Sequence, residues 1–134
     1  MTAMANGATR VRVRYAETDK MGVAHHSNYF VWFELGRSEL LRALGWTYRE
    51  MEDEGVMLPV IEASCAYLRP SRYDDELEVR ATAEVMSPAR LAFDYEIVRL
   101  PEATVLARGR TVHAAVSRTG KPCRLPDRAR TLLS

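Results

Sequence analysis

The 134-residue sequence predicts a single α+β domain in which an antiparallel sheet of about five strands curves around one long buried helix. Three observations predict this fold class. Residues 10–15 alternate Arg with Val and Tyr, which is the period of a half-buried strand. An apolar pattern at helical spacing runs from Asn28 to Gly45, and four strand-like segments follow it. One helix can bury its whole circumference only if the sheet curls around it.

The helical segment predicts a buried helix rather than one that lies on a surface. Residues 30–32 make its first turns apolar nearly all round, so we expect burial on most sides. Ser27 or Asn28 is expected as the N-cap, and Gly45 as the C-terminal cap. Gly36 inside the helix costs about 1 kcal/mol relative to Ala, and a close approach by another backbone would explain this cost. The positions at helical spacing are Tyr29, Phe33, Gly36, Leu40 and Leu44.

The rest of the chain predicts strands and one short helix, with no repeat and no linker that would divide the domain 1–134. A short helix is expected over 47–55. The last three strands are joined by tight turns, which predicts an antiparallel meander. Residues 1–8 are expected to form a loose N-terminus. The four predicted strands are 57–69, 76–87, 90–100 and 104–117.

Composition excludes several classes of function. The net charge of +1 favours neither nucleic acid nor an anionic membrane surface as a partner. No signal peptide is visible, and no apolar run approaches the roughly 20 residues of a membrane span. Cys65 and Cys123 are too few for a disulfide framework or a four-cysteine zinc site, and we expect free thiols. A cytoplasmic protein without a cofactor is therefore expected.

Residues 15–29, YAETDKMGVAHHSNY, concentrate ionisable side chains just before the long helix. A polar turn that caps the helix is the simpler interpretation, and an active site is the alternative. His25 and His26 do not predict a metal site, because adjacent histidines project in different directions and no third ligand is spaced nearby. The sequence has no Gly-x-Ser-x-Gly motif, and Cys65 lies within an apolar strand pattern, so a nucleophilic Ser or Cys is disfavoured. No glycine-rich nucleotide loop is present.

This stretch resembles the beginning of the 4-hydroxybenzoyl-CoA thioesterase family, including its Tol-Pal-associated acyl-CoA thioesterase branch. The family places a Tyr shortly before Thr-Asp, then a Gly, and a His or aromatic residue seven positions after the Asp. Segments 68–79 and 113–126 resemble two later blocks of the family, so the likeness covers nearly the whole chain. Met21 and His25 depart from the family, which often has Gly and Tyr there. The matching residues are Tyr15, Thr18, Asp19, Gly22, His26, Asn28, Tyr29, Phe33, Glu34, Arg37 and Glu39.

The resemblance implies a hotdog fold and hydrolysis of an acyl-CoA thioester. Asp19 would act as general base or nucleophile, and the backbone N–H near His26 would polarise the carbonyl. The helix N-terminus supplies such donors, since its first N–H groups lack partners within the helix. Glu17 has no such role and is expected to be solvated. The substrate-binding residues expected on this basis are Tyr15, Gly22, His25, Tyr29 and Arg90; Arg90, Arg118, Lys121 and Arg124 are the cations considered for the CoA phosphates.

The resemblance also implies a homodimer that completes each site at its interface, and two such dimers are expected to form a homotetramer. Two other functions stay open at this point: a hydratase or dehydratase acting on acyl thioesters, and a non-catalytic acyl-CoA-binding module. Aromatic, short-chain and medium-chain acyl groups, and CoA or acyl carrier protein as the thiol, are equally open.

Overall fold

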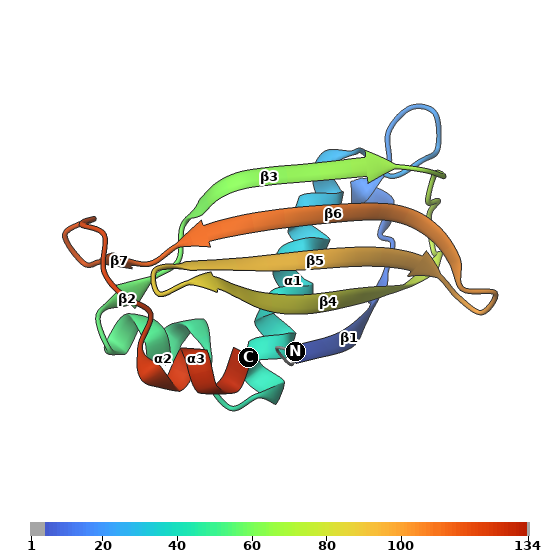
Figure 1. Cartoon of the computed structure of the whole chain (residues 1–134). Coiled ribbons are helices and arrows are strands. Elements are labelled where there is room, and N and C mark those ends of the chain that lie inside the picture. Colours follow the sequence, from blue (N-terminus) through green and yellow to red (C-terminus); the bar gives the residue numbers. More distant parts are fainter. Residues whose placement is uncertain (1–4, 134) are drawn as a thin grey trace.

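The computed structural model describes residues 5–133 and shows one five-stranded sheet with a long helix across one of its faces (Figure 1). Two short helices and a two-stranded ribbon lie at one end of the sheet. The elements are β1 (Ala5–Arg12), the single-turn helix η1 (Tyr15–Glu17), α1 (Ser27–Ala43), α2 (Tyr48–Asp53), β2 (Val56–Met57), β3 (Val60–Tyr67), β4 (Glu76–Ser87), β5 (Arg90–Arg99), β6 (Thr104–Ala114), β7 (Val116–Ser117) and α3 (Asp127–Leu133).

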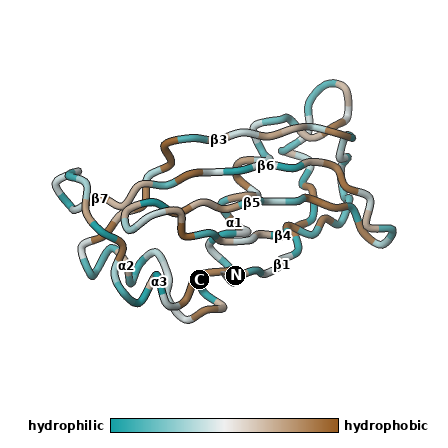
Figure 2. Tube along the Cα trace, in the orientation of Figure 1, coloured by the Kyte–Doolittle hydropathy of each residue, from teal (hydrophilic) through white to brown (hydrophobic). Residues whose placement is uncertain are grey.

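The main sheet has the order β1-β4-β5-β6-β3, and every neighbouring pair is antiparallel. Strands β4, β5 and β6 form the predicted meander. β1 and β3 are the two edges of this sheet. Strands β4 and β5 bury alternate residues, and Figure 2 shows hydropathy changing repeatedly along the strands. The inward side chains of β4 and β5 are buried against the helix: Leu77, Val79, Ala81, Ala83, Leu91, Phe93, Tyr95 and Ile97.

Helix α1 packs its apolar stripe on the sheet and leaves its opposite side open. The expectation of burial on most sides is wrong for the single chain, because Val31 is 55% exposed and Leu35 38% exposed. A five-stranded sheet covers only one side of the helix. The predicted close approach at Gly36 is present, but the Val79 side chain of β4 makes it rather than a backbone. The buried residues of α1 are Tyr29, Trp32, Phe33, Gly36, Leu40 and Leu41.

Three boundaries differ from the sequence expectations. β1 begins at Ala5, so residues 5–8 pair with β4 and are not a loose N-terminus, while residues 1–4 lie outside the described range. The predicted strand 57–69 divides into β2 and β3 around Pro59, whose ring removes a backbone donor. Likewise, the predicted strand 104–117 divides into β6 and β7, because the chain leaves the main sheet at Ala115 to pair with β2.

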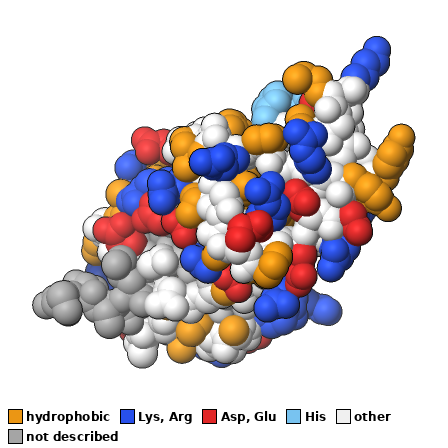
Figure 3. Space-filling model, turned by 90° about the vertical axis from the view of Figure 1, so that its right-hand side faces the viewer, with side chains coloured by type: hydrophobic (Ala, Val, Ile, Leu, Met, Phe, Trp, Pro, Cys, Tyr) orange, Lys and Arg blue, Asp and Glu red, His pale blue; other side chains and the backbone are white. Residues whose placement is uncertain are grey.

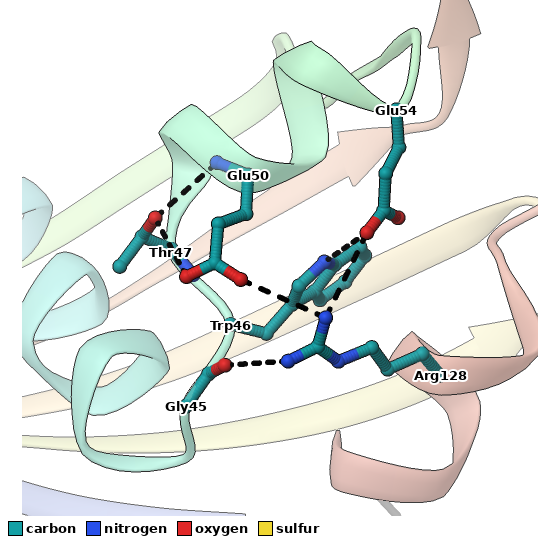
Figure 4. Close-up of polar contacts among 6 residues, drawn as sticks. All are labelled: Gly45, Trp46, Thr47, Glu50, Glu54 and Arg128. Atoms are coloured by element: carbon teal, nitrogen blue, oxygen red, sulfur yellow. Dashed lines mark hydrogen bonds and ion pairs between the residues drawn. The ribbon is translucent and has the colours of Figure 1, made fainter.

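The C-terminal helix α3 was not predicted, and it is tied to the expected helix α2 (Figure 4). Thr47 caps α2 by accepting a hydrogen bond from the Glu50 N–H at 3.2 Å. Arg128 of α3 donates to the Gly45 carbonyl at 2.7 Å and lies within 3.7 Å of Glu50 and Glu54 carboxylate oxygens. α3 therefore holds α2 against the end of the sheet. In residues 5–133, no helix is long and apolar enough to cross a membrane.

Candidate active site

A pocket of about 320 Å³ lies at the N-terminal end of α1. The loop before α1, the first turn of α1 and the end of β3 with its following loop form its walls. Figure 3 views this end of the molecule and shows a histidine among hydrophobic side chains at its upper edge. The lining residues are Asp19, Val23, Ala24, His26, Tyr29, Tyr67, Leu68, Arg69 and Pro70.

A tight loop fixes the position of Asp19. Its backbone N–H donates to the Val23 carbonyl at 2.8 Å, and its carbonyl accepts from the Gly22 N–H at 3.0 Å. Gly22 has φ +79°, a conformation that side-chain-bearing residues rarely adopt. The Met21 N–H donates to Asp19 Oδ1 at 2.8 Å, while Oδ2 has no donor among residues 5–133. The loop thus orients the carboxylate and leaves one of its oxygens available.

Glu17 is a buried residue that joins the loop to α1, so the expectation that it is solvated is wrong. Its carboxylate accepts from the Arg14 N–H at 2.7 Å and from the Trp32 indole N–H at 3.2 Å. The Glu17 carbonyl accepts from the His25 N–H at 2.8 Å and from the Asn28 side-chain amide at 2.9 Å. Only 6% of Glu17 is exposed. The sequence of residues 15–19 could not predict this burial, because Trp32, which lies in the later helix α1, covers Glu17 and donates to its carboxylate.

The start of α1 presents one free backbone donor. His26 is the N-cap residue, so neither Ser27 nor Asn28 takes the expected capping position. The Ser27 N–H donates to His25 Nδ1 at 3.2 Å, and the Asn28 N–H donates to the His25 carbonyl at 3.0 Å. The His26 N–H has no acceptor within the described part of the chain. It lies at the positive end of the helix dipole, where an oxygen that gains negative charge is stabilised.

Tyr67 of β3 forms the opposite wall and was missed from sequence. Its hydroxyl donates to the His26 carbonyl at 3.1 Å, and its ring packs edge-on against Tyr29 with the ring centres 4.9 Å apart. Burial raises the pKa of Tyr67 to about 12, so the hydroxyl stays protonated at neutral pH. The Tyr29 hydroxyl in turn shares a buried hydrogen bond of 2.9 Å with Ser71. These contacts fix the end of β3 beside the first turn of α1.

The sequence profile of the Thioesterase-like superfamily matches residues 13–133. The chain belongs to this superfamily. It is 35% identical over 101 residues to the acyl-CoA thioester hydrolase YbgC of Escherichia coli. The matched region covers 72% of this chain and 75% of the relative.

Solved structures of thioesterases superpose closely on the chain and confirm the hotdog fold. A 1,4-dihydroxy-2-naphthoyl-CoA thioesterase from Synechocystis matches with a TM-score of 0.89 and 25% identity, covering 95% of this chain and 94% of the other. A DHNA-CoA thioesterase from Staphylococcus aureus matches with a TM-score of 0.84 and 35% identity, covering 90% of this chain and 80% of the other.

Not all residues expected at a thioesterase-like site reach the pocket. Asp19, His26 and Tyr29 line it together. Gly22 and His25 lie beside the pocket and act through the backbone and the capping contacts described above, without lining it. Tyr15 is 78% exposed and packs edge-on against Tyr73 in a separate surface hollow, with the ring centres 5.8 Å apart. Its role in binding substrate is not supported by its position in the single chain.

Arg90 lies at the other end of the sheet. It begins β5, opposite Ala114 at the end of β6, whereas the pocket lies where β3 ends and β4 begins. Arg118 is also held at the distant end, where it donates to the backbone carbonyls of Glu52 and Asp53 at 3.2 and 3.0 Å. Lys121 and Arg124 lie in the segment between β7 and α3, at the same distant end. Within one chain, therefore, the cations considered for the CoA phosphates are not brought to Asp19.

Proposed function

We propose that this chain hydrolyses acyl-CoA thioesters to a free acid and CoA. One observation carries the proposal: the Asp19 carboxylate and the unpaired His26 N–H border the same pocket at the start of α1. Thioester hydrolysis needs a base or nucleophile and a donor for the carbonyl oxygen, and these two groups supply them. YbgC and the two solved structures above are named for CoA thioesters, whereas ATL3 of Arabidopsis thaliana, 28% identical over 121 residues, is named an acyl-acyl carrier protein thioesterase. The higher identity to YbgC supports CoA as the proposed thiol.

In this mechanism the thioester carbonyl oxygen accepts a hydrogen bond from the His26 N–H. Asp19 removes a proton from a water molecule, and the resulting hydroxide adds to the carbonyl carbon. The tetrahedral intermediate then collapses, the C–S bond breaks, and the CoA thiolate leaves and is protonated. Alternatively, Asp19 attacks the carbonyl carbon itself, the C–S bond breaks, and the CoA thiolate leaves and is protonated. Water then hydrolyses the mixed anhydride to the free acid and restores the Asp19 carboxylate. Both routes require the ionised carboxylate.

The narrower assignment to the 4-hydroxybenzoyl-CoA thioesterase family is also part of this proposal. It is supported by the spacing of Tyr15, Asp19 and His26 and by the later sequence blocks. A CoA thioester as substrate agrees with the cytoplasmic location expected from the sequence.

The exposed edge β3 supports the proposed homodimer. Among residues 5–133, no strand pairs with the outer side of β3, and exposed apolar side chains lie along it at Val60, Ile61 and Tyr67. A two-fold axis would pair two β3 edges antiparallel. The partner's opposite sheet end, with its own copy of Arg90, would then approach Asp19. A pair of such dimers would form the proposed homotetramer.

The test is thiol release from a panel of acyl-CoAs by the wild type and by Asp19→Asn, which keeps the side-chain size and removes the charge. We expect kcat/KM to fall by about 10²- to 10⁴-fold, the contribution typical of a positioned acid or base. Asp53→Asn is the matched control, because Asp53 is exposed at the end of α2 and lies outside the pocket.

The comparison requires that Asp19→Asn keeps the same oligomeric state as the wild type. Equal rates for the wild type and Asp19→Asn would remove Asp19 from the chemistry. No thiol release by the wild type, with acyl-CoA still bound, would favour the binding module. Addition of water to an enoyl-CoA without thiol release would favour the hydratase.

A further inference from the structure

Two more hollows lie along α1 beyond the Asp19 pocket, the first against β3 and β6 and the second against α2 and the segment between β2 and β3. One has a volume of about 340 Å³ and the next about 530 Å³, and both are bordered by Glu34 and Arg37. Phe30 and Val31, which line the first of these hollows, lie between His26 at the start of the helix and Arg37. At 1.5 Å per residue, the separation between His26 and Arg37 is about 16 Å along the helix axis. The first is lined by Phe30, Val31, Glu34, Arg37, Val60, Ala63 and Thr111, and the second by Glu34, Arg37, Tyr48, Glu52, Met57, Leu58, Pro59 and Val116.

Arg37 is a partly buried cation that is paired with neutral groups. Its Nε–H donates to the Tyr48 hydroxyl at 3.0 Å, and Nη1 donates to the Tyr95 hydroxyl in a longer contact of 3.5 Å. Within residues 5–133 no carboxylate forms an ion pair with it, and Nη2 has no acceptor. A buried charge without an opposite charge is costly to retain. Such a group commonly marks a site for a ligand.

A directed chain of hydrogen bonds prepares the tyrosine that faces Arg37. The Leu58 carbonyl can only accept, so His113 donates to it through Nδ1–H at 2.9 Å. The other ring nitrogen, Nε2, therefore accepts from the Thr111 hydroxyl at 2.8 Å, and Thr111 in turn accepts from the Tyr95 hydroxyl at 2.6 Å. The lone pairs of the Tyr95 hydroxyl oxygen are therefore free to accept the hydrogen bond from Arg37 Nη1. The chain holds the guanidinium in place with neutral acceptors and leaves its positive charge uncompensated.

We infer that Arg37 binds a carboxylate at the far end of the acyl group, so that the preferred substrates are acyl-CoAs whose chain ends in a carboxylate. This inference rests on the proposed thioesterase function. The apolar side chains between the two ends, such as Phe30 and Val60, suit the methylene groups of such a chain. The planar guanidinium suits a carboxylate better than a single hydroxyl, because it offers parallel N–H groups.

Glu52, which is exposed, borders the second hollow and would oppose an anion there, as would Glu34, which borders both hollows. The Glu34 side chain is also exposed, however, and neither carboxylate makes an ion pair with Arg37. Solvent therefore screens the charges of Glu34 and Glu52 more strongly than that of the partly buried arginine. The balance favours binding of an anion at Arg37.

The experiment compares octanoyl-, decanoyl- and dodecanoyl-CoA with their ω-carboxyl counterparts. The quantity measured is the ratio of kcat/KM for the carboxyl-ended and methyl-ended members of each pair. We expect a ratio above one for at least one chain length in the wild type, and a fall of about 30- to 100-fold in Arg37→Met, because a buried charged hydrogen-bond pair loses one partner. Arg42→Met is the matched control, because Arg42 lies on the same helix with 66% of its side chain exposed.

A wild type that prefers the methyl-ended member at every length would overturn the inference. So would an equal loss for both members in Arg37→Met, or dissociation of its oligomer, since either would indicate a structural role. If the wild type hydrolyses no thioester, the proposed function fails, and calorimetric binding of the same pairs to the wild type then decides the role of Arg37. Weaker binding of the carboxyl-ended member by Arg37→Met would support the inference, and equal binding would overturn it.

Discussion

A Cβ atom at Gly36 of α1 would lie 2.7 Å from Cγ1 of Val79 in β4. This helix position therefore requires a residue without a side chain. Val79 is fully buried and β-branched, so it cannot turn away easily. Gly36→Ala gains about 1 kcal/mol in helix propensity, but overpacking of a tight core costs about 1–3 kcal/mol. We expect a net destabilisation, measured as the free energy of unfolding in urea.

The double variant Gly36→Ala/Val79→Ala tests whether the contact is the cause. Removal of the Val79 methyl groups opens space for the new Cβ, so the two changes should couple by about 0.5–3 kcal/mol in the compensating direction. Strict additivity of the two single effects would show that the helix–strand contact is not responsible.

The buried Glu17 carboxylate should be more important for stability than its position in a loop suggests. In Glu17→Gln, the amide NH₂ would face either the Trp32 indole N–H or the Arg14 N–H, and both of these are donors. We expect a loss of about 1–3 kcal/mol in the free energy of unfolding, the cost of a buried donor left unsatisfied.

Glu39→Gln provides the comparison for Glu17→Gln. The Glu39 side chain is 41% exposed, and within residues 5–133 its carboxylate pairs only with Arg42. Its replacement should therefore change stability by no more than about 0.5 kcal/mol. Equal effects of the two substitutions would contradict a structural role for Glu17.

The features predicted correctly from sequence are those that neighbouring residues determine. The β4–β5–β6 meander follows from alternating strands and short turns, and the C-terminal cap at Gly45 agrees with its φ of +85°. Gly36 was recognised because glycine is unfavourable within a helix. The motif also predicted that Asp19 and His26 lie near each other, and both line the same pocket.

Features that depend on contacts between distant segments were missed. Gly109 lies in a strand pattern that does not predict close packing, yet a Cβ there would clash with the Phe33 ring. Tyr67 reaches the site only because β3 ends beside the first turn of α1. The outer side of α1 was expected to be buried, but it is exposed in the single chain. An apolar pattern indicates that a surface is covered, but it does not indicate whether the same chain covers it.

The buried His113 should make the fold weaker in acid. Burial lowers its pKa from 6.5 to about 4, so the unfolded chain binds the proton first as the pH falls. The stability associated with neutral His113 is complete above pH 6.5 and is lost progressively between pH 6.5 and 4. This loss amounts to about 3 kcal/mol. Protonation would also turn the acceptor that faces Thr111 into a donor.

Urea unfolding at several pH values in this interval measures the effect. His113→Asn removes the titration, so its free energy of unfolding should depend less steeply on pH than that of the wild type, even though the variant is less stable at neutral pH. Parallel pH profiles for the wild type and His113→Asn would show that His113 is not the titrating group.

The edge strand β3 should control both assembly and activity. Ile61 is 44% exposed in the single chain, on the strand proposed to pair with its copy. Ile61→Lys would place a charge in that interface, where burial without a partner is costly. We expect light scattering to show dissociation toward the monomer, and thiol release to fall with the oligomer because each site is proposed to need its partner. Met86→Lys makes the same change at a β4 residue that is 46% exposed and should alter neither property. An active Ile61→Lys monomer would show that one chain completes the site alone.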